Sequence, residues 1–236
     1  MKNTRSRKKL RPRIRDSAAT RAIILRAAER IFAEVGLAGA RTDSIAAAAG
    51  VNKAMLYYYF KSKVGLHRAV LEELVGEFQR GALEVLRTKT SASQVLLGYV
   101  SYHFDFIAAR PYYPRLFQRL AMTGDKHIAP MVRKYFVPLA REVRARIEGG
   151  MRSGEFKRLD PTHTAISLAA LTVFYFNAAP MIRLIGGFDP YQKDAQERRK
   201  QEVLKFIRYA LFRDLPRDAE SRAYKPGARG LREQVA

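Results

Sequence analysis

Residues Ile45–Lys63, IAAAAGVNKAMLYYYFKSK, decide the fold of this chain. Apolar residues are spaced here for two short helices, and the sequence Ala49-Gly50-Val51 separates them. Gly50 suits a sharp turn because a residue without a Cβ atom adopts a positive φ at little cost. Asn52 can cap the helix that follows. Two short helices joined by such a turn predict a helix-turn-helix, in which the second helix enters the major groove of DNA.

Polar residues with the chemistry of helix N-caps stand at intervals around this stretch. They are Ser17 or Thr20 before the first helix, Thr42 before the second, Asn52 before the third and Ser62 before the fourth. Gly36 is expected to end the first helix. These positions predict four helices before Thr90.

Beyond Thr90 the apolar residues recur at spacings of three and four, which is typical of amphipathic helices. Pro138 is expected to kink one of these helices, and Asp160 to cap another. The last two long helices are predicted over Thr162–Ala178 and Lys193–Phe212. Alternating patterns that would indicate strands are scarce, so the sequence predicts an all-α fold.

The chain is strongly basic. Its 236 residues carry 44 Lys and Arg against 22 Asp and Glu, a formal net charge of +22. Such a surplus favours a polyanionic partner, either nucleic acid or an anionic membrane surface. Residues 1–66 hold 15 of the basic and 4 of the acidic side chains, so the surplus is densest around the helix-turn-helix. The basic amino-terminal residues could follow the minor groove, attract DNA nonspecifically or simply remain solvated.

Other features argue against several classes of protein. The absence of Cys removes disulfides, thiolate metal sites and cysteine nucleophiles, and it favours a cytoplasmic protein. The segment Pro161–Ile182 has no Asp, Glu, Lys or Arg, but its polar residues favour a helix buried in protein over a membrane span. His103 and Asp105 face different sides of a helix, and Asp160 is better explained as a cap than as a catalytic group. We therefore expect no enzymatic activity, no cofactor, no metal and no membrane partner.

The segment Arg21–Lys63 resembles the DNA-binding domain of the TetR family of bacterial transcriptional regulators. The matching residues are Ile24, Ala28, Ile31, Phe32 and Gly36, then Thr42 and Ser44-Ile45-Ala46, then Ala49-Gly50-Val51, and finally Leu56-Tyr57-Tyr58-Tyr59-Phe60, Lys61-Ser62-Lys63 and Leu66. Ala54 stands where the family often has Gly, and Met55 where a small polar residue is common. Both departures lie at the base-reading end of the helix, so they bear on the operator sequence rather than on the family.

The resemblance implies how the helix-turn-helix meets DNA. Base edges would face Lys53, Ala54 and Tyr57, because Lys can donate to guanine O6 or N7 and Ala can contact a thymine methyl. Phosphates would be held by Thr42, Asn52, Tyr58, Tyr59 and Lys63. Consecutive residues on a helix cannot all face one way, so at least one of the three tyrosines is expected to be only half engaged with DNA.

The resemblance also implies a carboxy-terminal domain that binds a small-molecule effector and pairs two protomers. Aromatic residues gather on the middle helices, which favours an apolar or aromatic effector, although any one of them can simply belong to the core. The expected pocket residues are Tyr99, His103, Phe106, Phe117, Phe136, Phe174 and Asn177, with His103 an interior histidine rather than a metal ligand. The expected dimer-interface residues are Leu168, Leu171, Val203, Phe206, Ile207 and Ala210.

The chain is thus expected to have four parts: a basic disordered arm (1–16), a three-helix DNA-binding domain (17–64), a helical effector-binding and dimerisation domain (65–213) and a mobile tail (214–236). The implied function is that of a regulator, commonly a repressor, which binds a palindromic operator on double-stranded DNA as a homodimer and is released by its effector. The alternative is a nonspecific or architectural DNA-binding protein without an effector, since a charge of +22 attracts any duplex at low salt.

Overall fold

The computed structural model describes residues 14–122 and 125–213, and within these ranges the chain forms helices and no strand. The described helices are α1 (Ile14–Gly39), α2 (Thr42–Ala49), α3 (Lys53–Phe60), α4 (Lys63–Leu86), α5 (Ala92–Ala108), α6 (Tyr113–Ala121), α7 (Asp125–Met131), α8 (Val137–Arg152), α9 (Pro161–Asn177), α10 (Ala179–Gly186) and α11 (Lys193–Leu211). The predicted all-α fold is confirmed. The expected tail, and the expected arm apart from residues 14–16, lie outside the described residues.

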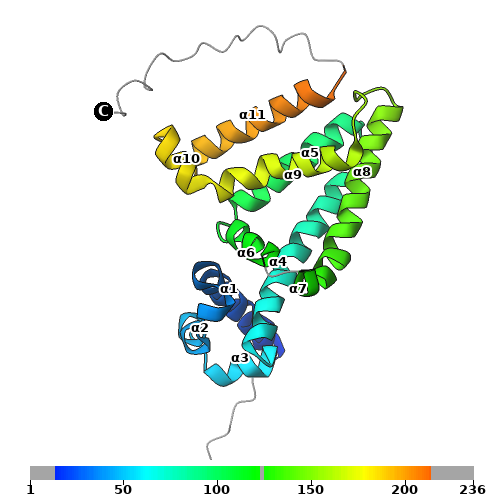
Figure 1. Cartoon of the computed structure of the whole chain (residues 1–236). Helices are drawn as coiled ribbons and strands as arrows, with labels where there is room; N and C mark the ends of the chain where they lie inside the picture. The colour runs from blue at the N-terminus through cyan, green and yellow to red at the C-terminus, as the bar shows by residue number, and fades with distance from the viewer. Residues whose placement is uncertain (1–13, 123–124, 214–236) are drawn as a thin grey trace, which may run out of the picture.

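The helices form two parts joined by α4 (Figure 1). α1, α2 and α3 pack around the start of α4 at one end of the molecule, and α5 to α11 build the other end. α4 has 24 residues, which makes it about 36 Å long. It therefore belongs to both parts and is the continuous rod between them.

The helix-turn-helix is held by the local contacts that its sequence predicts. Gly50 ends α2 with φ 64°, and the Asn52 side chain accepts a hydrogen bond of 2.8 Å from the Ala54 N–H at the start of α3. The Ser62 hydroxyl caps α4 by accepting from the Gly65 N–H at 2.9 Å. Leu56 and Phe60 are buried beneath α3. These contacts fix the angle at which α3 stands against α2.

Two boundaries differ from the predictions. α1 begins at Ile14 rather than at a cap on Ser17 or Thr20, and its helical run reaches Gly39, with a break at Gly36 where φ is 71°. Thr42 is the first residue of α2, and the residue before it, Arg41, gives no side-chain cap. Side-chain caps are thus replaced here by continuation of the helix or by backbone geometry.

The corner between α3 and α4 is too closely packed at Gly65 to hold a Cβ atom. A Cβ atom at this position would overlap the Phe60 carbonyl oxygen, so Gly65→Ala is expected to lower the free energy of unfolding by about 2 kcal/mol. Urea denaturation measures this quantity. Gly149→Ala is the matched control, because a Cβ on that glycine of α8 meets only the end of the Arg152 side chain. It should be neutral or raise stability by up to about 1 kcal/mol, and a loss equal to that of Gly65→Ala would contradict the steric explanation.

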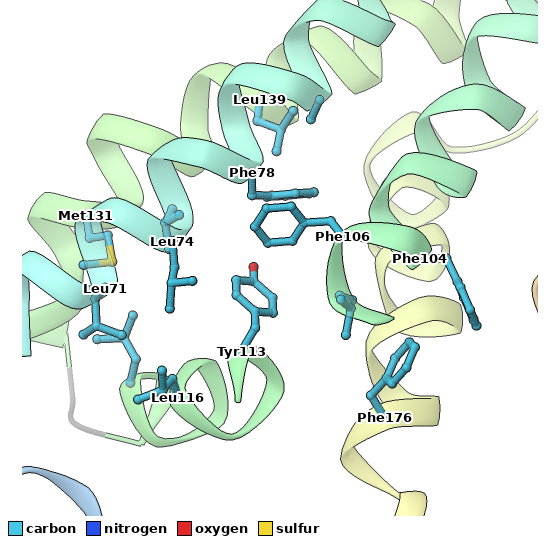
Figure 2. Close-up of a cluster of buried hydrophobic side chains, with 14 of the residues drawn as sticks. Leu71, Leu74, Phe78, Phe104, Phe106, Tyr113, Leu116, Met131, Leu139 and Phe176 are labelled. Atoms are coloured by element: carbon cyan, nitrogen blue, oxygen red, sulfur yellow. The ribbon is translucent and has the colours of Figure 1, made fainter. Parts of the chain in front are cut away.

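The larger part has an apolar core in which aromatic and aliphatic side chains of several helices meet. Figure 2 shows Phe78 of α4, Phe106 of α5 and Tyr113 of α6 in one cluster, with Leu139 of α8 above them. At the top of α8 the loop before α9 is tied back, because the Glu155 carboxylate accepts from the N–H groups of Ala92 and Ser93 at the start of α5. The core and its loops therefore hold α5, α8 and α9 together.

Prolines and caps shape the later helices. Pro138 has no N–H to donate, and the chain forms a π-helical stretch, Val132–Phe136, between α7 and α8 instead of the predicted simple kink. The Asp160 side chain caps α9 by accepting from the His163 N–H at 2.8 Å, as predicted.

The uncharged segment predicted as one buried helix is divided between two. α9 and α10 meet at an angle of 71°. No single helix among the described residues is long and apolar enough to cross a membrane, while this bent pair passes by length and composition alone.

Candidate DNA-binding interface and effector core

The exposed face of α3 carries most of the residues predicted to touch DNA. Tyr57 is 44% exposed and Tyr58 is 69% exposed, and Lys53 and Ala54 are exposed at the start of the helix. A tyrosine that leaves so much of its ring in water gains little from the protomer's own core. The placement fits a surface that contacts a partner, and the individual contacts with bases and phosphates stay predictions.

Two residues predicted to bind phosphates, Lys63 and Tyr59, form hydrogen bonds within the protein. The Lys63 ammonium group donates to the carbonyl oxygens of Ala40 at 2.9 Å and Ala38 at 3.3 Å, where it satisfies acceptors at the end of α1. The half-buried Tyr59 donates through its hydroxyl to Ser17 Oγ at 3.3 Å. Tyr59 thus packs edge-on against the Tyr58 ring, at 5.0 Å between ring centres, while its hydroxyl reaches α1. Lys63 links the start of α4 to the end of α1.

Lys53 has an acidic partner that the sequence prediction missed. Its Nζ lies 2.9 Å from Oδ1 and 3.0 Å from Oδ2 of Asp43, in the first turn of α2. The hydrogen bond from Lys53 lowers the pKa of Asp43, and the same bond raises the pKa of Lys53. Only the fold could reveal this pair, because the two residues are ten positions apart on different helices.

Lys61 also belongs to this surface. It is the one described residue other than glycine with a positive φ, 64°, in the corner between α3 and α4. Its ammonium group donates to the Tyr58 carbonyl oxygen at 3.2 Å and lies 5.9 Å from the centre of the Tyr58 ring. The position of the exposed tyrosine is therefore tied to a basic residue that the sequence motif already contained.

In the second domain, three of the predicted pocket residues lie together. Tyr99, His103 and Phe106 are each buried on α5. Phe78 of α4, which was not predicted as a pocket residue, joins them: its ring centre is 4.7 Å from that of His103 and 5.2 Å from that of Phe106. The signal for Phe78 was its place on the apolar stripe of α4, which a sequence pattern cannot distinguish from ordinary core.

His103 is a neutral hydrogen-bonded histidine. Its Nδ1 lies 2.9 Å from Thr172 Oγ1 of α9, and that hydroxyl donates to the Ala169 carbonyl oxygen at 2.8 Å. Because the hydroxyl has one proton, Nδ1 must donate to it, and this assigns the lone pair to Nε2. Burial lowers the pKa of His103 to about 4. The core thus contains an uncharged acceptor among aromatic rings, where burial also raises the pKa of Tyr99 to about 12.

The other predicted pocket residues lie in different environments. Phe117 stacks on Tyr113 at 6.0 Å and contacts Phe136 at 5.5 Å between ring centres, so both extend the aromatic cluster. Asn177 has a buried Oδ1 without a hydrogen-bond partner in the described chain. Phe174 is 60% exposed and points out of the protomer, so its assignment to the pocket was wrong. Helix α9 places it opposite the core-facing Tyr175 and Phe176.

The two domains meet at a charged junction. Arg110, between α5 and α6, forms an ion pair with Glu77 of α4 and lies with its guanidinium carbon 4.2 Å from the Phe106 ring centre. Burial raises the pKa of Glu29 on α1, and the nearby charge of Arg110 opposes that rise. A groove of about 320 Å³ beside these residues lies between α1 and α4. Arg110 therefore touches the aromatic core on one side and faces the DNA-binding domain on the other.

A second contact joins α6 to α1. Arg119 donates to the Glu34 carbonyl oxygen at 3.3 Å. A Cβ atom on Gly36 would come within 2.9 Å of the Arg119 guanidinium, so the absence of a side chain at the break in α1 leaves room for it. Helix α6 thus rests on the DNA-binding domain through a backbone acceptor.

The predicted dimer residues gather between α9 and α11. A groove of about 380 Å³ is lined by Leu168, Leu171, Phe206, Ile207 and Ala210, among others. Three predicted residues, Leu168, Val203 and Ile207, are buried by the protomer itself, so they cannot protrude toward a partner. The large apolar residues that α9 and α11 leave exposed are Ile166 and Phe174 of α9 and Phe206 of α11. We call Ile166, Phe174 and Phe206 the α9/α11 face.

Both domains of the chain match the profiles of known protein families. The profile of the bacterial regulatory proteins of the tetR family matches residues 24–70, which contain the helix-turn-helix. The profile of the tetracyclin repressor-like C-terminal domain matches residues 85–207. The chain belongs to the TetR family. It is a DNA-binding transcriptional regulator and not an enzyme.

Curated relatives in the TetR family span most of the chain. The transcriptional regulator RutR of Escherichia coli K12 is 29% identical over 175 residues, which cover 74% of this chain and 82% of RutR. The transcriptional repressor NicS of Pseudomonas putida is 28% identical over 212 residues, covering 87% of this chain and 96% of NicS. Both the DNA-binding and the second domain therefore take part in the similarity.

Solved structures of transcriptional regulators have the same fold. The putative regulator SCO4942 of Streptomyces coelicolor aligns with a TM-score of 0.62 and 26% identity, covering 80% of this chain and 97% of that one. FadR of Bacillus subtilis, solved with stearoyl-CoA, aligns with a TM-score of 0.64 and 21% identity, covering 79% and 96%. The second similarity supports the fold alone.

Proposed function

We propose that this TetR-family regulator is a homodimeric repressor that binds a palindromic operator in the bacterial cytoplasm and leaves it when an effector binds. The observation that carries the proposal is that one protomer has both an exposed recognition surface on α3 and an exposed apolar face on α9 and α11. Two protomers joined through that face would present two copies of α3. A symmetric pair of recognition helices reads half-sites spaced by about one DNA turn or a multiple of it.

The α9/α11 face supports dimerisation by its composition. Phe174, Phe206 and Ile166 are each close to 60% exposed, and Phe206 also lines the groove between α9 and α11. Contiguous exposed apolar side chains of this kind mark interaction sites on soluble proteins. Ile166 and Phe174 are two helical turns apart, so they lie on one side of α9. A second copy of the same helices would cover them.

The aromatic core supports an effector that is largely apolar and carries a hydrogen-bond donor. Its rings supply flat apolar surfaces, and His103 Nε2 supplies an acceptor. FadR of Bacillus subtilis, which has the same fold, was solved with stearoyl-CoA, a ligand with a long apolar acyl chain. In our proposal the effector favours a conformation in which the two copies of α3 no longer match the operator spacing. Arg110, which touches both Phe106 and Glu77, would carry part of that change to α4.

Selection from random duplex DNA with the purified full chain tests the proposal. We expect recovery of a palindromic sequence, bound at physiological salt about a thousandfold or more tighter than random DNA. A mass measurement in solution should give a dimer. Titration of the operator complex with a metabolite library should then identify compounds that release the protein. A lack of any enriched sequence would instead favour the nonspecific DNA-binding protein, for which the net charge of +22 is the supporting observation.

Substitutions on α3 should separate base reading from phosphate binding. Lys53→Ala is expected to weaken binding to the operator about tenfold and binding to random DNA much less, because it removes the ammonium group that would donate to guanine O6 or N7. Tyr58→Phe is expected to weaken both DNAs alike, about threefold, because it loses one phosphate hydrogen bond. Fluorescence anisotropy measures both affinities. Equal losses of Lys53→Ala on the two DNAs would show that Lys53 does not read bases.

A further inference from the structure

We infer that Asp43 restrains Lys53, so that the lysine contributes little to nonspecific DNA binding and is released only for an operator base. This rests on the proposed function, in which α3 is the recognition helix. Asp43 thereby becomes a specificity-determining residue of the interface, although its own charge repels phosphate. The nucleic-acid group that would release Lys53 is a guanine edge, which offers O6 and N7 together.

The geometry of the pair supports this restraint. The Lys53 ammonium group contacts both carboxylate oxygens of Asp43, at 2.9 and 3.0 Å. The two residues come from the first turns of α2 and α3, the two helices of the motif. Both side chains stay accessible, with 45% of Lys53 and 62% of Asp43 exposed. The charge of the ammonium group is therefore balanced by the Asp43 carboxylate at the surface. The group can still leave this carboxylate for another acceptor.

Such a pair changes how Lys53 responds to DNA without a matching base. A free lysine near the phosphates displaces about one condensed counterion, which adds about 0.9 to the slope of log affinity against log salt. A lysine already paired with a carboxylate gains little from a phosphate, because exposed ion pairs of either kind are worth a similar, small amount. The ammonium group has three N–H donors, so it can donate to O6 and N7 where a guanine edge presents both acceptors at the right position. The restraint thus suppresses the nonspecific use of Lys53.

A double-mutant cycle on random-sequence duplex DNA tests the inference. The full-length wild type, Asp43→Asn, Lys53→Ala and the double variant are compared by anisotropy over a range of salt concentrations. Asp43→Asn should raise affinity for random DNA about fivefold at 0.1 M salt and steepen the salt slope by about 0.9. Lys53→Ala should leave the wild-type slope unchanged, and it should remove the added slope in the Asp43→Asn background.

Two results would overturn the restraint. If Lys53→Ala lowers the wild-type slope by as much as it lowers that of Asp43→Asn, the lysine is not masked. If Asp43→Asn steepens the slope equally when residue 53 is alanine, the aspartate acts only through its own charge. Asp194→Asn is the matched control, because Asp194 is an exposed residue in the first turn of α11, and it should leave the slope unchanged.

The cycle is independent of the operator. Random DNA is its only ligand, so its outcome does not depend on the selection experiment. An unenriched selection would refute the proposed function, whereas the two slope results above would refute the restraint alone. Thermal unfolding of each variant should match the wild type, since both side chains are exposed. Asp43→Ser, which keeps a polar residue in the first turn of α2, should reproduce the slope of Asp43→Asn.

Discussion

Phe174→Glu is expected to dissociate the dimer and to weaken operator binding on the order of 100-fold, because the second half-site is then no longer held by a linked protomer. Phe174 is 60% exposed in the protomer, so the substitution leaves the fold intact. In a dimer that covers the α9/α11 face, the same carboxylate would be buried against apolar side chains without a partner. Analytical ultracentrifugation measures the dimer, and anisotropy measures affinity for the selected operator.

Met122→Glu is the control for this substitution. Met122 is 81% exposed at the end of α6, beside Glu34 of α1 and outside the α9/α11 face, and it undergoes the same change from an apolar to an acidic side chain. We expect it to remain dimeric. A Phe174→Glu protein that stays dimeric with full operator affinity would place the dimer contact on another surface.

Acidification should destabilise the protein through His103. In the folded state burial lowers the pKa of His103 to about 4, whereas the unfolded chain has the ordinary value of about 6.5. Between these pH values His103 is protonated in the unfolded state and neutral in the folded state, so the free energy of unfolding falls as the pH falls from 6.5 to 4. The full contribution is about 3 kcal/mol, and it is measured as the change in unfolding free energy in urea.

His103→Asn isolates this contribution, because the amide can still donate to Thr172 and does not titrate. Its own stability is expected to be lower, but its pH dependence below 6.5 should be weaker than that of the wild type by about 3 kcal/mol. His67 is also partly buried, and burial lowers its pKa too, so His67→Asn should remove a smaller part. An unchanged pH dependence in His103→Asn would mean that the histidine is protonated in the folded core.

The features that the sequence predicted correctly are local ones. The caps at Asn52, Ser62 and Asp160 each depend on an N–H within three residues, so the chain near each cap contains all the information needed. The turn at Gly50 is of the same kind. These signals, together with the spacing of apolar residues, were sufficient for the all-α fold and for the helix-turn-helix.

The sequence did not reveal contacts between side chains and partners that are distant along the chain. Lys63 donates to carbonyl groups 23 and 25 residues earlier, and Asp43 meets Lys53 from another helix. A lysine in a DNA-binding motif does not reveal in sequence which acceptor it meets. Phe174 was placed in the pocket because α9 is apolar on nearly every side, so periodicity could not distinguish its core-facing side from its outer side.

One helix also links the interior of a protomer to its neighbour. Thr172, fully buried on α9, holds His103, and Phe174 stands outward only two residues further along the same helix. A hydrogen-bonded helix moves as a rigid body, so whatever displaces Thr172 also displaces Phe174. In a dimer joined through the α9/α11 face, ligand binding in the core of one protomer would then shift α9 at the interface and so change the other protomer. The two protomers would bind their ligands cooperatively.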